Sequence, residues 1–176
     1  VLFVSSGLVY TSLNAAARAR VDAFLATGGV VTRGATGARF NTDAGLLPVT
    51  AVAGRGDANG VVAVTNGTGL LGAGAPPNAF IFSPLFFANV GAGVTVEQRY
   101  AAGNPLVAGH WLPNAQGNGG PEQAAGQAAV VSGVAARGTA TAVFGTEPLF
   151  RNHPKGSFAQ VSKAVFWATA LVPATV

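Results

Sequence analysis

Residues 1–34 carry the pattern that most constrains the fold: an apolar run, a helical segment, a double glycine and a second apolar run. Val1–Val4 is continuously apolar, which is typical of a buried parallel strand. Ser12 can cap a helix that runs to about Thr27, and the Gly28–Gly29 pair would end it. Val30–Thr32 is the next strand. Because a strand, a helix and a strand in this order form a right-handed parallel unit, the sequence predicts an α/β domain.

The rest of the chain is mostly extended and contains no linker that would divide it, so we expect a single domain over residues 1–176. A short helix is expected over Thr36–Leu47 and a final helix over Ser157–Ala170. We expect loops at Gly67–Asn78 and Pro113–Gly126, and strands at Pro48–Ala53, Val61–Thr65, Phe80–Phe82, Leu85–Ala88, Val94–Tyr100 and Asn104–Trp111. Ala128–Val134 and Thr139–Phe144 are joined by a short turn and predict a hairpin.

The charged and apolar residues indicate which kinds of partner the chain can have. Only 9% of the residues are charged, against about 25% in typical soluble domains, which indicates that another domain or a second copy covers part of an apolar surface. No apolar run approaches the roughly 18 residues needed to span a bilayer, so we expect no membrane partner. The net charge is +4, but the ten basic residues are scattered, so we expect no nucleic acid either.

The absence of cysteine limits the chemistry further. It excludes disulfides, thiolate zinc sites and a cysteine nucleophile. The two histidines, His110 and His153, are not part of a His-x-x-Glu motif, whereas a zinc enzyme needs three protein ligands. We therefore expect no metal and no other cofactor.

A serine-based site is the remaining catalytic option. Ser5 and Ser6 directly follow the first strand, and ligands bind open α/β sheets at the carboxyl ends of strands. His110 or His153 would supply the base. The other serines (Ser12, Ser83, Ser132, Ser157 and Ser162) are further candidates, but none lies in a Gly-x-Ser-x-Gly motif. The alternative interpretation is that these hydroxyls satisfy loop backbone groups.

A second candidate site precedes the last helix. Arg151, His153 and Lys155 lie just before its N-terminus, and helix N-termini attract anions. In the alternative interpretation, Arg151 pairs with Glu147 or with carbonyl groups and fixes the loop. The aromatic residues Phe80, Phe82, Phe86, Phe87 and Tyr100 form either core or a docking face.

Three segments of the chain carry a resemblance to a known family. Residues 1–34 read as a strand, a helix, a Gly-Gly pair and a strand, and residues 104–111 read N-P-L-V-A-G-H-W. Residues 138–151 read G-T-A-T-A-V-F-G-T-E-P-L-F-R and are followed by His153, Gly156, Phe158 and Trp167. Together they resemble the class I glutamine amidotransferase-like domains found C-terminal in actinobacterial secreted zinc carboxypeptidases of the carboxypeptidase A type.

The resemblance implies a three-layer α/β fold with a flavodoxin- or amidotransferase-like sheet, mostly parallel, with an antiparallel extension. It implies no amidotransfer, because the family's catalytic cysteine has no counterpart here. The implied function is that of a non-catalytic accessory domain, for stability, docking or substrate placement, in a secreted zinc carboxypeptidase. The alternatives are a degenerate amidotransferase-like or serine hydrolase, and a small-ligand or glycan-binding module.

The resemblance also implies a partner. The chain opens inside an apolar strand and contains no methionine, so we expect it to be a fragment of a longer protein. The partner would be an upstream catalytic domain of the same polypeptide, secreted with it. Without that partner, the exposed apolar surface favours self-association.

Overall fold

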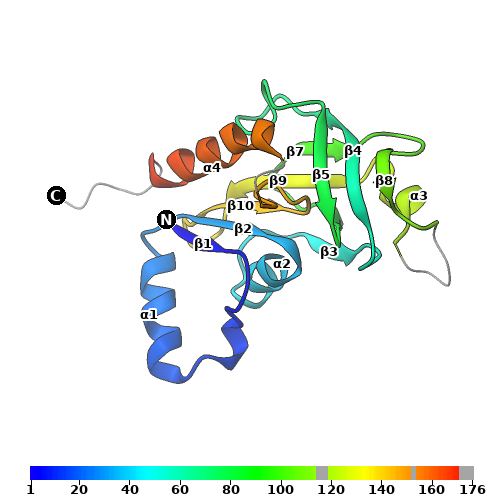
Figure 1. The fold of residues 1–176 in the computed structure, drawn as a ribbon. Coiled ribbons are helices and arrows are strands. Elements are labelled where there is room, and N and C mark those ends of the chain that lie inside the picture. The colour runs from blue at the N-terminus through cyan, green and yellow to red at the C-terminus, as the bar shows by residue number, and fades with distance from the viewer. Residues whose placement is uncertain (114–118, 152–153, 171–176) are drawn as a thin grey trace.

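A computed structural model describes residues 1–113, 119–151 and 154–170 (Figure 1). The helices are α1 (Ala15–Leu25), α2 (Gly34–Asp43), α3 (Pro121–Ala124) and α4 (Phe158–Ala170), with 3₁₀ turns η1 (Tyr10–Ser12) and η2 (Lys155–Ser157). The strands are β1 (Leu2–Val4), β2 (Val30–Arg33), β3 (Thr50–Ala53), β4 (Asn59–Asn66), β5 (Asn78–Phe82), β6 (Leu85–Ala88), β7 (Val94–Tyr100), β8 (Leu106–His110), β9 (Ala128–Val134) and β10 (Ala140–Phe144). The chain is therefore an α/β protein.

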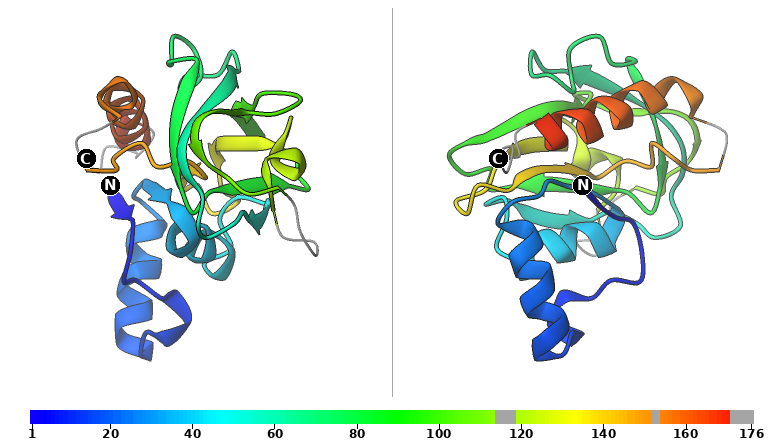
Figure 2. Two further views of the ribbon diagram at one scale, coloured as in Figure 1. Left: turned by 45° about the vertical axis from the view of Figure 1, so that its right-hand side comes forward. Right: turned by 90° about the vertical axis from the view of Figure 1, so that its left-hand side faces the viewer.

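The N-terminal unit confirms the strand–helix–strand prediction. β1 and β2 pair in parallel, with Leu2 opposite Val30, and α1 connects them. The predicted helix start is wrong: Ser12 lies in η1, and α1 is capped by Asn14, whose side chain accepts a hydrogen bond from the Ala17 N–H at 2.9 Å. Only Leu25 of α1 is fully buried, so most of this helix extends beyond the sheet (Figure 2).

The sheet is mixed, and the prediction of a mostly parallel flavodoxin-like sheet is wrong. Its order is β1-β2-β10-β9-β7-β4-β5, with β6 pairing β9 and β3, and with β8 pairing β4. Among the named strands only β1–β2 and β2–β10 are parallel. A parallel pair needs a crossover of a dozen or more residues, usually a helix. Residues 50–110 contain no helix, so these strands pair antiparallel; β9 and β10 form the predicted hairpin.

Layering is restricted to the parallel part of the sheet, where α2 and α4 cover opposite faces of β2 and β10 (Figure 1). On one face, Val31, Ala142 and Phe144 pack against α4 through Val161, Ala164 and Ala168. On the other face, Ala38 of α2 packs with Val143. Alternate residues of each strand therefore serve two different cores, as the period of two requires.

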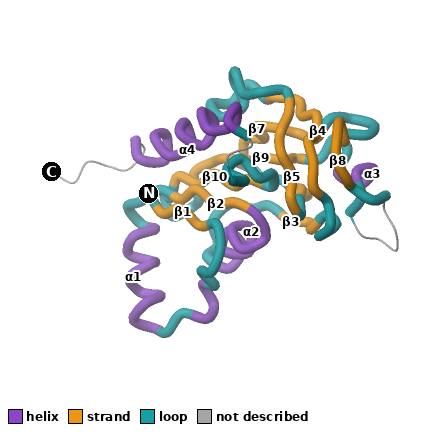
Figure 3. Tube along the Cα trace, viewed as in Figure 1, coloured by secondary structure: helices purple, strands orange, loops and turns teal. Residues whose placement is uncertain are grey.

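The antiparallel part curls around a second core (Figures 2 and 3). This core contains Tyr100 and Trp111, whose rings meet edge to face with centroids 5.7 Å apart. The Tyr100 hydroxyl donates to the Leu85 carbonyl at 2.9 Å, and burial raises the pKa of that phenol. The Glu147 N–H donates to the Phe80 carbonyl at 2.8 Å, so the segment after β10 lies against β5, the last strand in the sheet order. The curl brings the loop before α4 next to β5.

Candidate functional site

The structure separates the serine candidates from His110. Ser5 and Ser6 follow β1 at one end of the sheet, and Ser6 is exposed. His110 is the last residue of β8, which pairs with β4, and four strands lie between β1 and β4 in the sheet order. Figure 1 shows β1 and β8 on opposite sides of the molecule. Neither serine therefore has His110 as a base, and His153 lies outside the described residues.

An ion pair that the sequence analysis missed lies at the carboxyl ends of the parallel strands. Arg33 ends β2, Glu147 follows β10, and the Arg33 guanidinium binds the Glu147 carboxylate. Burial raises the pKa of Glu147, while the positive charge of Arg33 acts in the opposite direction. The pairing of Arg151 with Glu147, one of the two alternatives above, is therefore replaced by an Arg33 pair. The rule that placed Ser5 at this edge could have placed Arg33 and Glu147 there too.

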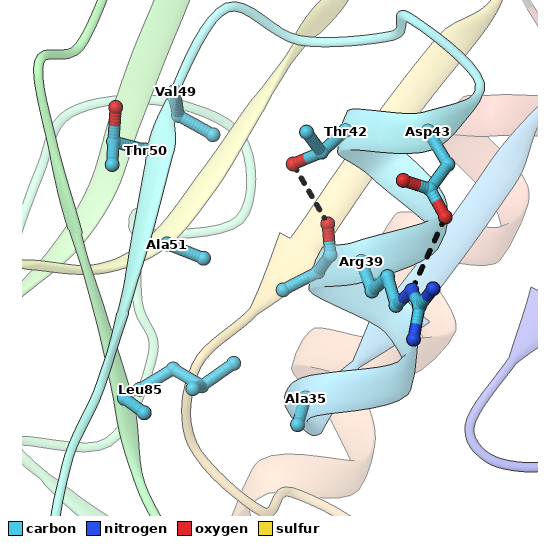
Figure 4. A pocket seen from close by; sticks show the side chains of 10 residues that line it. Ala35, Arg39, Thr42, Asp43, Val49, Thr50, Ala51 and Leu85 are labelled. Atoms are coloured by element: carbon cyan, nitrogen blue, oxygen red, sulfur yellow. Dashed lines mark hydrogen bonds and ion pairs between the residues drawn. The ribbon is translucent and has the colours of Figure 1, made fainter.

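Beside this edge, a pocket of about 420 Å³ lies between α2 and β3 (Figure 4). Its walls are mostly small apolar side chains, among them Ala35, Ala51 and Leu85. Its polar groups are paired: Arg39 and Asp43 form an ion pair at 3.3 Å one helical turn apart, and the Thr42 hydroxyl donates to the Ala38 carbonyl at 3.2 Å. With its polar groups engaged in this way, the pocket offers no activated nucleophile.

His110 lies in a polar corner with Asp57 and Ser83. Its Nε2 is 3.8 Å from Asp57 Oδ2, but Arg55 also binds both oxygens of Asp57, at 3.3 and 3.4 Å. The hydrogen bond from Arg55 is the main reason that the pKa of Asp57 is lowered. The Ser83 hydroxyl donates to the Gly56 carbonyl at 2.7 Å, and no serine donates to His110 within the described residues. The corner contains the residue types of a Ser-His-Asp triad, but its hydrogen bonds do not run from the serine hydroxyl to the histidine as a triad requires.

A group of residues that we call the β5 corner consists of Phe80, Phe82, Phe150, Arg151 and Lys155. Arg151 follows Phe150 in the chain, and Lys155 begins η2, directly after Pro154. Phe150 stacks on Phe80 and on Phe82, with ring centroids 4.9 and 5.0 Å apart. The Arg151 guanidinium lies over the Phe150 ring, 5.3 Å from its centroid. A pocket of about 280 Å³ adjoins the cluster, lined by Val61, Pro76, Asn78, Ala79, Phe80, Pro154, Gly156 and Ser157. Of the three residues suggested as an anion site, Arg151 contacts the aromatic cluster, Lys155 lies between the pocket residues Pro154 and Gly156 in the chain, and His153 lies outside the described residues.

The outer face of α4 is apolar. Phe166 is 75% exposed, and Leu70 from a neighbouring loop is 52% exposed. A shallow hollow of about 550 Å³ is lined by Leu70, Ala159, Ser162, Lys163, Phe166, Trp167 and Ala170. The one cation in this lining, Lys163, donates to the Ala73 carbonyl at 2.8 Å.

No protein-family model matches the chain, and no curated protein matches its sequence. Within residues 1–113, 119–151 and 154–170, no group of three or more His, Asp or Glu side chains is placed to hold a metal ion. No helix in the same residues has the length and apolar character to cross a membrane.

Proposed function

We propose that this chain is a non-catalytic accessory domain of a secreted hydrolase of the zinc carboxypeptidase type, and that it packs on the catalytic domain of the same polypeptide. The observation that carries the proposal is the apolar outer face of α4. A phenylalanine as exposed as Phe166 leaves about 1.5–3 kcal/mol of burial free energy unused. Exposed apolar patches of this kind mark interaction sites.

Two further observations support docking on α4. Because Lys163 is held by the Ala73 carbonyl, a partner that covers the hollow does not bury a bare ammonium group. The core side of α4 already packs on β2 and β10 through Val161, Ala164 and Ala168, whereas Phe166 on the outer side is 75% exposed. The layers formed by β1, β2, β10, α2 and α4 support a distant amidotransferase-like origin for this part alone.

The separation of Ser5 and Ser6 from His110 supports a non-catalytic role. Proton transfer needs a base within hydrogen-bond reach of the nucleophile, at about 2.6–3.2 Å. The hydroxyl of Ser83, the serine beside His110, already donates to Gly56. We therefore do not carry the serine hydrolase alternative further.

The test uses the two domains as separate chains. We expect the reading frame upstream of Val1 to encode a zinc peptidase domain with a His-x-x-Glu motif, and that domain to bind residues 1–176 in isothermal titration calorimetry. Phe166→Asp with Leu70→Asp should weaken binding by roughly tenfold or more. The matched control is Phe24→Asp on α1, since Phe24 is also exposed, at 37%. An unrelated upstream domain, or binding that the double variant leaves unchanged, contradicts the proposal.

A second candidate function, small-ligand or glycan binding, is favoured by the β5 corner. There, a pocket with apolar and aromatic walls adjoins stacked rings and an arginine that lies over one of them, and apolar walls with a few polar groups are usual in a small-molecule site. This function does not conflict with docking, because no residue lines both the hollow on α4 and the pocket of the β5 corner.

A further inference from the structure

The pocket of the β5 corner suits a small apolar group. Pro76, Phe80 and Pro154 form apolar walls, and Asn78 is the polar side chain at the β5 end. A volume of about 280 Å³ lies just below the usual range for ligand pockets, which is about 300–1,000 Å³. It therefore fits a single ring better than a chain of sugars.

The cations beside this pocket are not engaged with acidic groups. Within the described residues, no ion pair links Arg151 or Lys155 to a carboxylate, and both side chains are exposed. Asp22, Asp43, Asp57 and Glu147 each pair with a different arginine, and Glu97 accepts from the Leu71 and Gly72 N–H groups and from Ser132. Among the described residues, therefore, no ion pair with a carboxylate neutralises the positive charge of the β5 corner.

Arg151 is held in a defined place. Its guanidinium lies over the Phe150 ring, and Phe150 is in turn stacked on Phe80 and Phe82. A guanidinium on an aromatic face keeps its planar N–H fork free, and that fork matches the two oxygens of a carboxylate. Phe80 belongs to both the stack and the pocket wall, so two stacked rings, Phe150 and Phe80, connect this cation to the pocket.

We propose that the β5 corner binds an aromatic carboxylate, with its ring in the pocket beside Phe80 and its carboxylate on Arg151 and Lys155. The inference does not depend on docking through α4. The same chemistry occurs in a free aryl acid and in a peptide that ends in phenylalanine, and the experiment separates these two sources.

The experiment titrates residues 1–176 with probes that differ in one group. N-acetyl-phenylalanine carries the ring and the carboxylate, its amide lacks the charge, and acetate lacks the ring. We expect chemical-shift changes in residues 78–82 and 154–157 with the acid, and affinity weaker by roughly tenfold or more with the amide or acetate. Tighter binding of Gly-Gly-Phe than of N-acetyl-phenylalanine assigns a peptide terminus, and the reverse assigns a free acid.

Variants and rival probes make the proposal falsifiable. Arg151→Gln should lower the affinity for the acid by roughly fivefold to tenfold and leave the affinity for the amide unchanged. Arg20 is an exposed arginine on α1, and Arg20→Gln should change neither affinity. Phe80→Ala, which removes an aromatic wall of the pocket, should weaken binding of the acid and of the amide alike, with circular dichroism confirming the fold. Absence of shift changes, equal binding of acid and amide, or tighter binding of phenyl phosphate or of a neutral disaccharide would overturn the proposal.

Discussion

At the scale of single residues, two buried threonines differ in whether the side-chain hydroxyl has a hydrogen-bond partner. Both Thr32 and Thr139 are fully buried. The Thr139 hydroxyl donates to the Leu25 carbonyl, which ties β10 to the end of α1. The Thr32 hydroxyl faces α2 and has no hydrogen-bond partner in the part of the chain that the structure describes. The two positions therefore form a matched pair for testing.

Thr32→Val should leave the free energy of unfolding unchanged or raise it by about 1 kcal/mol, because an isosteric methyl removes an unsatisfied hydroxyl. Thr139→Val should lower it by about 1–2 kcal/mol, because the Leu25 carbonyl loses its donor. Urea unfolding of the two variants measures both values. A larger loss for Thr32→Val than for Thr139→Val would show that the hydroxyl of Thr32 is satisfied after all.

Glu147 should give the protein a pH-dependent stability. Its pKa is raised above the ordinary value of 4.5 by burial, so the native state holds the proton more tightly than the unfolded chain does. The contribution of Glu147 is therefore fully present below pH 4.5 and is lost as pH rises through the native pKa. As the pH rises from 4.5 through the native pKa, the free energy of unfolding of the wild type should fall relative to that of Glu147→Gln, as measured by urea unfolding at a series of pH values. Asp57→Asn is the control of opposite sign, because the pKa of Asp57 is lowered.

At the scale of elements, periodicity and turn residues located most strands within one or two residues. The runs at residues 85–88, 94–100 and 128–134 became β6, β7 and β9 with the predicted bounds. Neighbours in the sheet were not predictable, because pairing depends on contacts distant in sequence, such as β2 with β10. The same limit applied to sites. The sequence indicated a charged segment before the last helix, but the position of Phe150 beside Phe80 and Phe82 depends on the curl of the sheet.

Helix α2 packs on β2 through a glycine, which gives a test at this scale. A Cβ on Gly37 would lie 2.7 Å from the Thr32 Cβ and 3.0 Å from the Val4 carbonyl oxygen. Gly37→Ala gains about 1 kcal/mol of helix propensity but forces α2 away from the strands, so we expect the free energy of unfolding to fall by about 1–2 kcal/mol in total. Thermal unfolding of the variant and the wild type measures this difference. Ala35→Gly, in the first turn of the same helix, should lose only the propensity, and a stabilised Gly37→Ala would refute the tight contact.

At the scale of the whole molecule, the apolar face of α4 should govern association. Without its proposed partner, the isolated chain should self-associate, because the hollow around Phe166 offers water almost no polar surface. Sedimentation velocity over a concentration series should show a dimer or larger species, and Phe166→Asp should shift it toward monomer. As a control, Phe24→Asp should leave the distribution of monomer and oligomer unchanged. A wild-type protein that stays monomeric at the highest concentration would contradict association through the apolar face of α4.

The pairing of β2 with β10 also affects how the chain is made. Arg33 and Glu147, which join the ends of these strands, are 114 residues apart in the sequence. During translation, β1, α1 and β2 leave the ribosome early. Most of the protein has to be synthesised before β10 is available to pair with β2. During that wait an apolar strand edge is open to neighbouring nascent chains, which is where misassembly begins. The last closure joins sequence-distant segments, so folding should be slow and benefit from a chaperone that shields β2 during translation.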